Sequence, residues 1–395
     1  MPTDDLRVAL CFGTYPPERN GGADFLARFA GALAEAGVAI TVLTSPADAP
    51  AFEQVSPRLA VHRIVDDWTL LGGFRRHTLT KANRVLRAAE VQVLHVFFPD
   101  SVLQRRYQLP VAVRLGRVPL VTTFWNLGLG GGSPLSIRAE SLALLTRSAV
   151  LTSHDPGYLR VLRNPFGLGR PVRWLPVGNN LEAEPVDDRS GLRERLSLDP
   201  DAAQLAYFGQ LDVTRGVEDL FEALRRLRTT RDVRLLMIGS AGRAERYAAD
   251  DESHAYYRRL LDLPDALGVA EAVTWTPYLP DDEVTRMLQA VDLCVLPYRR
   301  NSIGRSALAA ALSLGAATVL AGTERDIAPL RAGHDVALVP PGQPDVLAST
   351  VASLLDDPEA IERLRGGALH AAQLFAWPRI AETAVEIYRE ALARR

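Results

Sequence analysis

The chain has 395 residues with a formal net charge of −2, and 47% of them are hydrophobic and 23% charged. This length allows two globular domains, each with its own core, and the near-neutral charge argues against a general nucleic-acid binder. No run approaches the roughly 18 apolar residues of a membrane span, and the N-terminus lacks a signal-peptide pattern, so we expect a cytoplasmic protein. Cys11 and Cys294 lie inside apolar runs, which predicts reduced core residues without a disulfide or metal role.

The chain opens with a β–loop–α–β pattern. Leu6–Phe12 is an apolar run that is typical of a buried parallel strand, and Val38–Leu43 is the next one. Between them, a helical pattern follows Gly21 and Gly22. Adjacent glycines before a helix allow backbone amides to approach a ligand closely, although such pairs also occur in ordinary turns.

Further strand-like runs alternate with helical stretches through the first half. This order predicts a largely parallel, doubly wound sheet, with ligand groups on the loops at the carboxyl ends of the strands. The predicted strands are Val91–Phe97, Pro119–Thr123, Ala149–Ser153 and Val172–Pro176, and the predicted helices lie around Leu79–Ala89 and Leu135–Arg147.

Three side chains on those loops are candidate catalytic or acceptor-side residues. Trp125 would form a wall for a sugar ring, or else pack as a core aromatic, and Asn126 would bind sugar hydroxyls. His154, beside Asp155, would bind a hydroxyl or move a proton, with an ordinary surface turn as the alternative.

A local charge asymmetry covers Gly72–Arg117, which holds nine Lys and Arg residues against two acidic ones. Such a face would suit an anionic membrane surface or a phosphorylated acceptor. A solvated basic surface is the alternative, because the run lacks a clean aromatic-rich amphipathic helix.

The second half repeats the strand–helix alternation. We predict a first domain over residues 1–183, a linker over 184–202, a second Rossmann-like domain over 203–376 and a terminal helix over 377–395. The expected strands of the second domain are Leu205–Phe208, Val233–Ile238, Val273–Trp275, Leu293–Leu296, Ala317–Leu320 and Ala337–Val339.

Two loops in this half are candidate phosphate sites. The first runs from Gly209 to Gly216 before an amphipathic helix, and it carries Gln210 and Arg215. The second follows Pro297 and leads into an Ala/Leu-rich helix; the residues we expect at the phosphate are Arg299, Arg300, Ser302, Ile303, Gly304 and Arg305. Backbone N–H groups and the dipole at a helix start favour an anion, and guanidinium groups add to that preference. A solvated basic turn is the alternative.

Taken in order, these motifs resemble the family-4 retaining glycosyltransferases of GT-B fold over nearly the whole chain. The matching segments are Tyr15–Pro17 with Gly21 and Gly22, Leu175–Asn180, Phe208–Leu224, the strand ending at Pro297, Gly315–Val319, Val339–Ala348 and the final FAWPRIAETAVEIYREAL. The resemblance implies two Rossmann-like domains facing across a nucleotide-sugar cleft. It also implies a last helix that crosses back to the first domain.

The chain departs from the family pattern at three places. The Arg and Lys that hold the donor diphosphate correspond to Gln210 and Arg215. The two glutamates of the Glu-x7-Glu motif correspond to Asn301 and Ala309, or to Ser302 and Ala310 in a second alignment, so neither register supplies a carboxylate. The usual histidine after the strand at Pro119–Thr123 corresponds to Trp125 or Asn126.

We therefore expect a retaining, metal-independent glycosyltransferase without a cofactor. It would move a sugar from a nucleotide-diphosphate sugar to a small-molecule, glycan or lipid-linked acceptor, with Gly21 and Gly22 adding backbone donors to the phosphate. One alternative is a degenerate GT-B protein that binds a sugar nucleotide or a partner enzyme without turnover. Another is a transferase for an unusual donor, such as a phosphoribosyl-type or lipid-linked sugar phosphate.

Overall fold

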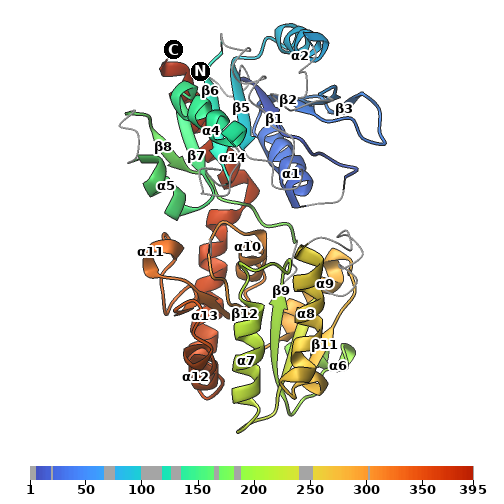
Figure 1. Cartoon of the computed structure of the whole chain (residues 1–395), viewed down its shortest axis with the longest axis vertical. Coiled ribbons are helices and arrows are strands. Elements are labelled where there is room, and N and C mark those ends of the chain that lie inside the picture. The colour runs from blue at the N-terminus through green and yellow to red at the C-terminus, as the bar shows by residue number, and fades with distance from the viewer. Residues whose placement is uncertain are drawn as a thin grey trace. The chain divides into compact units, whose positions relative to one another are not determined.

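The computed structural model describes residues 6–18, 21–65, 76–98, 118–125, 135–163, 169–181, 188–239, 252–300 and 303–394. The chain divides into two compact units. The first unit comprises Met1–Gly178 together with Ala376–Arg395, and the second comprises Asn179–Phe375. Each unit is built on one sheet with helices packed against it (Figure 1).

The sheet of the first unit has eight strands in the order β3-β4-β2-β1-β5-β6-β7-β8. All neighbours pair in parallel except β3 and β4, which are antiparallel at one edge. The strands are β1 (Arg7–Cys11), β2 (Ala39–Thr44), β3 (Phe52–Ser56), β4 (Leu59–Arg63), β5 (Val93–Phe98), β6 (Leu120–Phe124), β7 (Val150–Ser153) and β8 (Val172–Trp174).

Helices cover both faces of this sheet, which explains why its central strands are apolar on both sides. One core cluster joins α1 and α14 to the sheet, and the other brings in residues of α2, α4 and α5. The helices are α1 (Gly21–Glu35), α2 (Arg76–Ala88), α4 (Leu135–Arg147), α5 (Pro156–Arg163) and α14 (Trp377–Ala393). Cys11 lies in this core and Cys294 in that of the second unit, both as buried free thiols, as predicted.

The terminal helix α14 returns to the first unit, as the family resemblance predicted, and packs beside α1 (Figure 1). Its apolar stripe includes Ile380, Ala384 and Ile387, and all three are buried. Gly178 makes room for the first residue of the helix, because a Cβ added there would lie 2.5 Å from the Trp377 ring. Two distant sequence motifs therefore meet at this contact.

The sheet of the second unit has six strands in the order β11-β10-β9-β12-β13-β14, all parallel. Its strands are β9 (Ala203–Phe208), β10 (Val233–Ile238), β11 (Val273–Trp275), β12 (Leu293–Leu296), β13 (Thr318–Ala321) and β14 (Ala337–Val339). Its α-helices are α6 (Arg189–Arg195), α7 (Val217–Leu227), α8 (Glu252–Ala266), α9 (Asp281–Ala290), α10 (Ser306–Ser313), α11 (Glu324–Ile327), α12 (Pro344–Leu355) and α13 (Pro358–Ala372). Short 3-10 turns occupy Ala270–Ala272 and Gln373–Phe375.

The predicted strands of both halves are present, with ends shifted by two residues at most. The β3–β4 hairpin was not predicted, because Phe52–Ser56 is an exposed edge strand without an apolar run. Residues 188–195 of the predicted linker form the end of a loop and α6, whose Arg193 binds Asp292 of the second unit at 2.6 Å. Within the described ranges, no helix is long and apolar enough to cross a bilayer.

Candidate functional site

The two predicted phosphate loops lie side by side because their strands are neighbours. β9 pairs directly with β12, with Leu205 opposite Leu293 and Ala206 opposite Cys294. The chain runs from β9 outward to β11 on one side, and from β12 outward to β14 on the other. The carboxyl ends of β9 and β12 therefore form the point where the strand order reverses, which is where open parallel sheets bind ligands.

Asp212 shapes the first of these loops. Its carboxylate accepts hydrogen bonds from the Thr214 backbone N–H at 2.8 Å, from the Thr214 hydroxyl, and from Arg215 Nε at 2.8 Å. Burial alone would raise the pKa of this carboxyl, but Arg215 and the Thr214 hydrogen bonds hold it below its ordinary value. Asp212 therefore stays ionised at neutral pH and fixes the direction of Arg215, a role the sequence did not indicate.

Tyr298, the first residue after Pro297, is a platform for two of the arginines. Its ring is fully buried, and the guanidinium carbons of Arg215 and Arg305 lie 5.5 Å and 4.9 Å from the ring centroid. Both distances are within the range of cation–π attraction. The Arg215 side chain is only 11% exposed, so the ring and Asp212 hold it in one place.

Arg305 connects the two loops. Its Nη2 donates to the Thr214 hydroxyl at 3.0 Å and to the Arg300 carbonyl oxygen at 2.8 Å. Burial, and then the neighbouring Arg215, lower the pKa of Arg305. Two partly buried cations are thus brought together on one aromatic ring, an arrangement that an anionic ligand would stabilise.

Arg299 turns toward α7 and away from this pair. It donates to the Asp219 carboxylate at 3.0 Å and 3.2 Å, and it lies 3.7 Å from Glu218. This ion pair braces the second loop against the start of α7, helped by the Arg299 backbone N–H, which donates to the Thr214 carbonyl at 2.9 Å. The structure thus gives Arg299 a positioning role, whereas Arg215 and Arg305 converge.

The other predicted donor-side residues have different surroundings. Gln210 and Arg300 are exposed, Ile303 is buried in the core, and Gly304 is half-buried just before α10. The start of α10 has no capping hydrogen bond from its N-cap side chain, Arg305. Ser302 lies outside the described residues.

The predicted acceptor-side pair of Trp125 and His154 does come together in the first unit. The two ring centroids are 4.2 Å apart, and Phe25 packs against both rings. His154 is 2% exposed, so the surface-turn interpretation is wrong for this residue, because the chain folds it under the Phe25 aromatic cluster. Asn126 lies outside the described residues.

His154 and the partly buried Trp125 each present a buried nitrogen atom for hydrogen bonding. His154 Nδ1 contacts the Leu175 carbonyl oxygen, and burial lowers the pKa of His154 to about 4. The neutral ring therefore donates its Nδ1 proton to that carbonyl and keeps a lone pair on Nε2. Within the described ranges, His154 Nε2 and Trp125 Nε1 have no hydrogen-bond partner.

Gly21 is the first residue of α1, and Gly22 follows in its first turn. A Cβ added at Gly21 would meet no atom of the described residues within 4 Å, so they leave space beside this helix start. The preceding Tyr15–Pro17 loop is held by Arg63, whose buried guanidinium donates to the Pro16 carbonyl at 2.7 Å. Arg63 is the last residue of β4, a strand that was not predicted, so this contact was not predicted either.

Described side chains of the basic region Gly72–Arg117 include Lys81, Arg84 and Arg87 of α2, all three exposed. The parts of this region at 72–75 and 99–117 lie outside the described residues. Among the described residues no group of three or more His, Cys, Asp or Glu side chains is arranged to hold a metal ion.

Comparison with known proteins connects this geometry to a class of enzymes. Residues 202–357, which include both phosphate loops, match the family model "Glycosyl transferases group 1". The chain is 29% identical to D-inositol 3-phosphate glycosyltransferase 1 of Catenulispora acidiphila over 291 residues, which cover 70% of this chain and 67% of that protein.

Solved structures agree on the fold. Sucrose-phosphate synthase from Thermosynechococcus elongatus superimposes with a TM-score of 0.76 at 19% identity, covering 99% of this chain and 100% of that one. The Anabaena protein HepE, solved in complex with UDP-glucose, gives a TM-score of 0.71 at 16% identity, covering 97% of this chain and 99% of that one. The chain is therefore a transferase enzyme, a glycosyltransferase with the GT-B fold.

Proposed function

We propose that the chain transfers a sugar from a nucleotide-diphosphate sugar to a hydroxyl group, with retention of anomeric configuration and without a metal ion or cofactor. The carbon–oxygen bond between the sugar and the diphosphate breaks, a bond to the acceptor oxygen forms, and the acceptor's proton passes to the leaving phosphate. The last step is an expectation from the family resemblance.

One observation carries this proposal: Arg215 and Arg305 converge on the Tyr298 ring at the strand-order reversal. Because Asp212 and Thr214 hold these guanidinium groups in place, they would meet the growing charge on a leaving diphosphate without reorganising. The start of α10 and the loop residues Ile303 and Gly304 would add backbone donors. HepE, which has the same fold, was solved with UDP-glucose, in agreement with such a donor.

The first unit would supply the acceptor contacts. His154 Nε2, a buried neutral acceptor, would take a hydrogen bond from the attacking hydroxyl, and Trp125 Nε1 would donate to another oxygen of the same molecule. With a pKa of about 4, His154 is a weak base and suits orientation better than proton abstraction. A polyol acceptor is a natural first choice, since the relative from Catenulispora acidiphila is named for an inositol phosphate.

The test combines nucleotide binding with product analysis. UDP, GDP, ADP and TDP would be titrated calorimetrically, and their glucose conjugates incubated with inositol 3-phosphate and other polyols before NMR analysis of the anomeric centre. We expect one diphosphate to bind, and Arg215→Met or Arg305→Met to weaken it about 10- to 100-fold, since a hydrogen bond to a charged group contributes about 1.5–3 kcal/mol. Arg225→Met is the matched control, because Arg225 is a half-exposed arginine on α7 paired with Glu222.

The outcomes separate the candidate functions. No binding of any diphosphate, or equal binding by Arg215→Met, Arg305→Met and the native chain, would refute the proposed donor site. Tight binding without transfer or hydrolysis would favour the non-catalytic alternative, which is motivated by Ala309 and Ala310 at the positions of the family glutamates. Binding of phosphoribosyl pyrophosphate in place of a nucleoside diphosphate would favour the unusual donor. Membrane contact through the basic region also remains a prediction, and co-sedimentation with anionic vesicles would test it. Cytoplasmic location remains a prediction as well, and cell fractionation would test it.

A further inference from the structure

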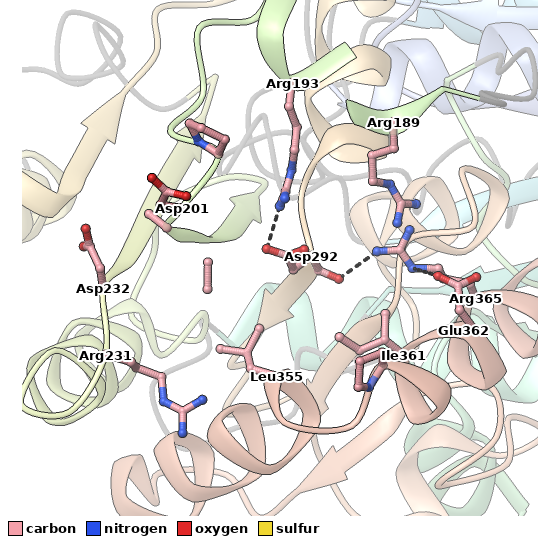
Figure 2. Close-up of a pocket in the computed structure, with 14 residues that line it drawn as sticks. Arg189, Arg193, Asp201, Arg231, Asp232, Asp292, Leu355, Ile361, Glu362 and Arg365 are labelled. Atoms are coloured by element: carbon pink, nitrogen blue, oxygen red, sulfur yellow. Dashed lines mark hydrogen bonds and ion pairs between the residues drawn. The ribbon is translucent and has the colours of Figure 1, made fainter. Parts of the chain in front are cut away.

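The second unit has a pocket at the amino ends of the central strands of its sheet (Figure 2). It has a volume of about 490 Å³, and its lining includes Ala203, Asp232 and Asp292, which stand at the amino ends of β9, β10 and β12. The Arg215–Arg305 pair follows the carboxyl ends of β9 and β12, so this pocket is separate from the proposed donor site. Its size falls within the range of small-molecule sites.

One end of the pocket is rich in arginine. Arg365 is only 7% exposed, and its Nη2 donates to the carbonyl oxygens of Val291 and Asp292 at 3.4 Å and 3.2 Å. Its Nη1 is buried and has no hydrogen-bond partner in the described part of the chain. Figure 2 shows the Arg189 side chain directed toward this guanidinium group. Two like charges thus face each other in a confined space.

The carboxylates near these arginines already have other partners or lie at a longer distance. Asp292 Oδ2 already accepts hydrogen bonds from Arg193 Nη2 at 2.6 Å and from the Gln204 backbone N–H at 2.8 Å. Glu362 lies 3.4 Å from Arg365 Nε. Arg189 Nε donates to the Gln289 carbonyl oxygen at 2.9 Å. Among the described residues at this end, the guanidinium groups of Arg189, Arg193 and Arg365 thus have two carboxylates, Asp292 and Glu362, beside them.

Burial adds to the cost of placing these positive charges together. The pKa of Arg189 is lowered, first by burial, although Glu362 and Asp292 oppose the change. A buried, incompletely paired charge is costly, and an anion bound between Arg189 and Arg365 would remove that cost.

The other end of the pocket has a different character. Asp201 is exposed, and Asp232 already pairs with Arg228 at 3.1 Å. Arg231 also lines this end, where it is paired with Asp356 at 3.0 Å, so the carboxylates of Asp201 and Asp232 face the pocket beside a cation that already has its own partner. Leu355 and Ile361 provide an apolar surface between the two ends (Figure 2). Carboxylates repel a second anion but accept hydrogen bonds from hydroxyl groups, which points to a ligand with one phosphate and several hydroxyls.

We propose that this pocket binds a small sugar phosphate, with its phosphate between Arg189 and Arg365 and its hydroxyls toward Asp201. The site is distinct from the proposed donor site and does not depend on it.

The test uses the full chain and glucose 6-phosphate as the probe, with glucose and inorganic phosphate for comparison. Calorimetric titration should show saturable binding of glucose 6-phosphate, weaker binding of inorganic phosphate and none of glucose. Arg189→Met should weaken glucose 6-phosphate at least tenfold. Arg189→Met is the deciding variant, because the native Arg365 side chain also holds the backbone before β12 and its loss would disturb folding. Thermal unfolding of Arg189→Met and Arg365→Met checks that both are folded.

Two controls locate the binding event. Arg215→Met, at the donor site, and Arg286→Met, an exposed arginine on α9, should leave glucose 6-phosphate affinity unchanged. The proposal is overturned if neither glucose 6-phosphate nor inorganic phosphate binds. It is also overturned if binding is lost in Arg215→Met but kept in Arg189→Met, which would place the probe in the donor site.

Discussion

Replacing Gly216 by alanine tests how closely the two donor-side loops are fitted together. Gly216 has a φ of 64°, and a Cβ added there would lie 2.1 Å from the Pro297 carbonyl oxygen. A backbone oxygen cannot rotate aside, so the loops must separate, which would strain the hydrogen bond from the Arg299 N–H to the Thr214 carbonyl. The variant should therefore lose both stability and nucleotide affinity.

The magnitude follows from two contributions. An alanine in the left-handed region costs about 1–2 kcal/mol, partly offset by about 0.4–1 kcal/mol from its lower entropy in the unfolded chain. Overpacking a closed contact adds about 1–3 kcal/mol. Gly216→Ala should therefore destabilise the second unit by about 1–5 kcal/mol.

Gly268 supplies the matched control. Its φ is 68°, but a Cβ added there would meet nothing within 4 Å in the part of the chain that the structure describes, so Gly268→Ala measures the conformational contribution alone. Calorimetric unfolding would give the stability of both variants, and hydrogen exchange would show whether protection is lost in α7. Equal stability for Gly216→Ala and Gly268→Ala would refute the close fit between the loops.

The remaining predictions concern the first unit. Gly178→Ala should cost about 1–3 kcal/mol of unfolding free energy, because its Cβ would overlap the Trp377 ring. Adding Trp377→Leu to this variant should restore part of that stability. If the effects of the two substitutions simply add, the contact between Gly178 and Trp377 is contradicted. Arg63→Met should cost about 1–3 kcal/mol in urea unfolding, because it leaves the half-buried Pro16 carbonyl without its donor. A change below about 0.5 kcal/mol, the scatter of ordinary surface substitutions, would contradict this role. Burial lowers the pKa of His154 to about 4 and of His95 to about 3, below the unfolded value of 6.5. Below pH 6.5 the unfolded chain therefore binds protons that the folded chain does not, so stability should fall as pH drops from about 6.5 toward 4. A melting temperature that stays constant over this pH range would contradict the expectation.

Much of the fold could be predicted because parallel strands buried on both faces are continuous apolar runs. Val91–Phe97 and Leu293–Leu296 were visible for that reason, and the second is present with the predicted ends. Phe52–Ser56 was not visible, because an edge strand needs no apolar face and its pairing with β4 is a long-range property. The return of α14 to the first unit was predicted from the family resemblance, since periodicity alone shows an amphipathic helix but not its partner.

The candidate site was predictable only in part. Sequence spacing placed Arg215, Arg299 and Arg305 on neighbouring loops, but it could not separate their roles. That separation depends on Asp219, which pairs with Arg299, and on Tyr298, which draws the other two together. Tertiary partners of this kind set the direction of each side chain. Several arginines close together in the sequence therefore need not all point toward the same ligand.

Two alanines that the family resemblance aligns with a glutamate, Ala309 and Ala310, bear on the proposed donor site. Ala309 and Ala310 are 0% and 1% exposed within α10, so their methyl groups are part of the core. A carboxylate at either place would be buried and, without a partner, costly, so glutamate could not be restored there by substitution alone. Neither position supplies a carboxylate that could accept hydrogen bonds from ribose hydroxyls. We therefore expect the affinity for a nucleotide donor to depend mainly on the diphosphate, the group that we propose Arg215, Arg305 and the start of α10 bind.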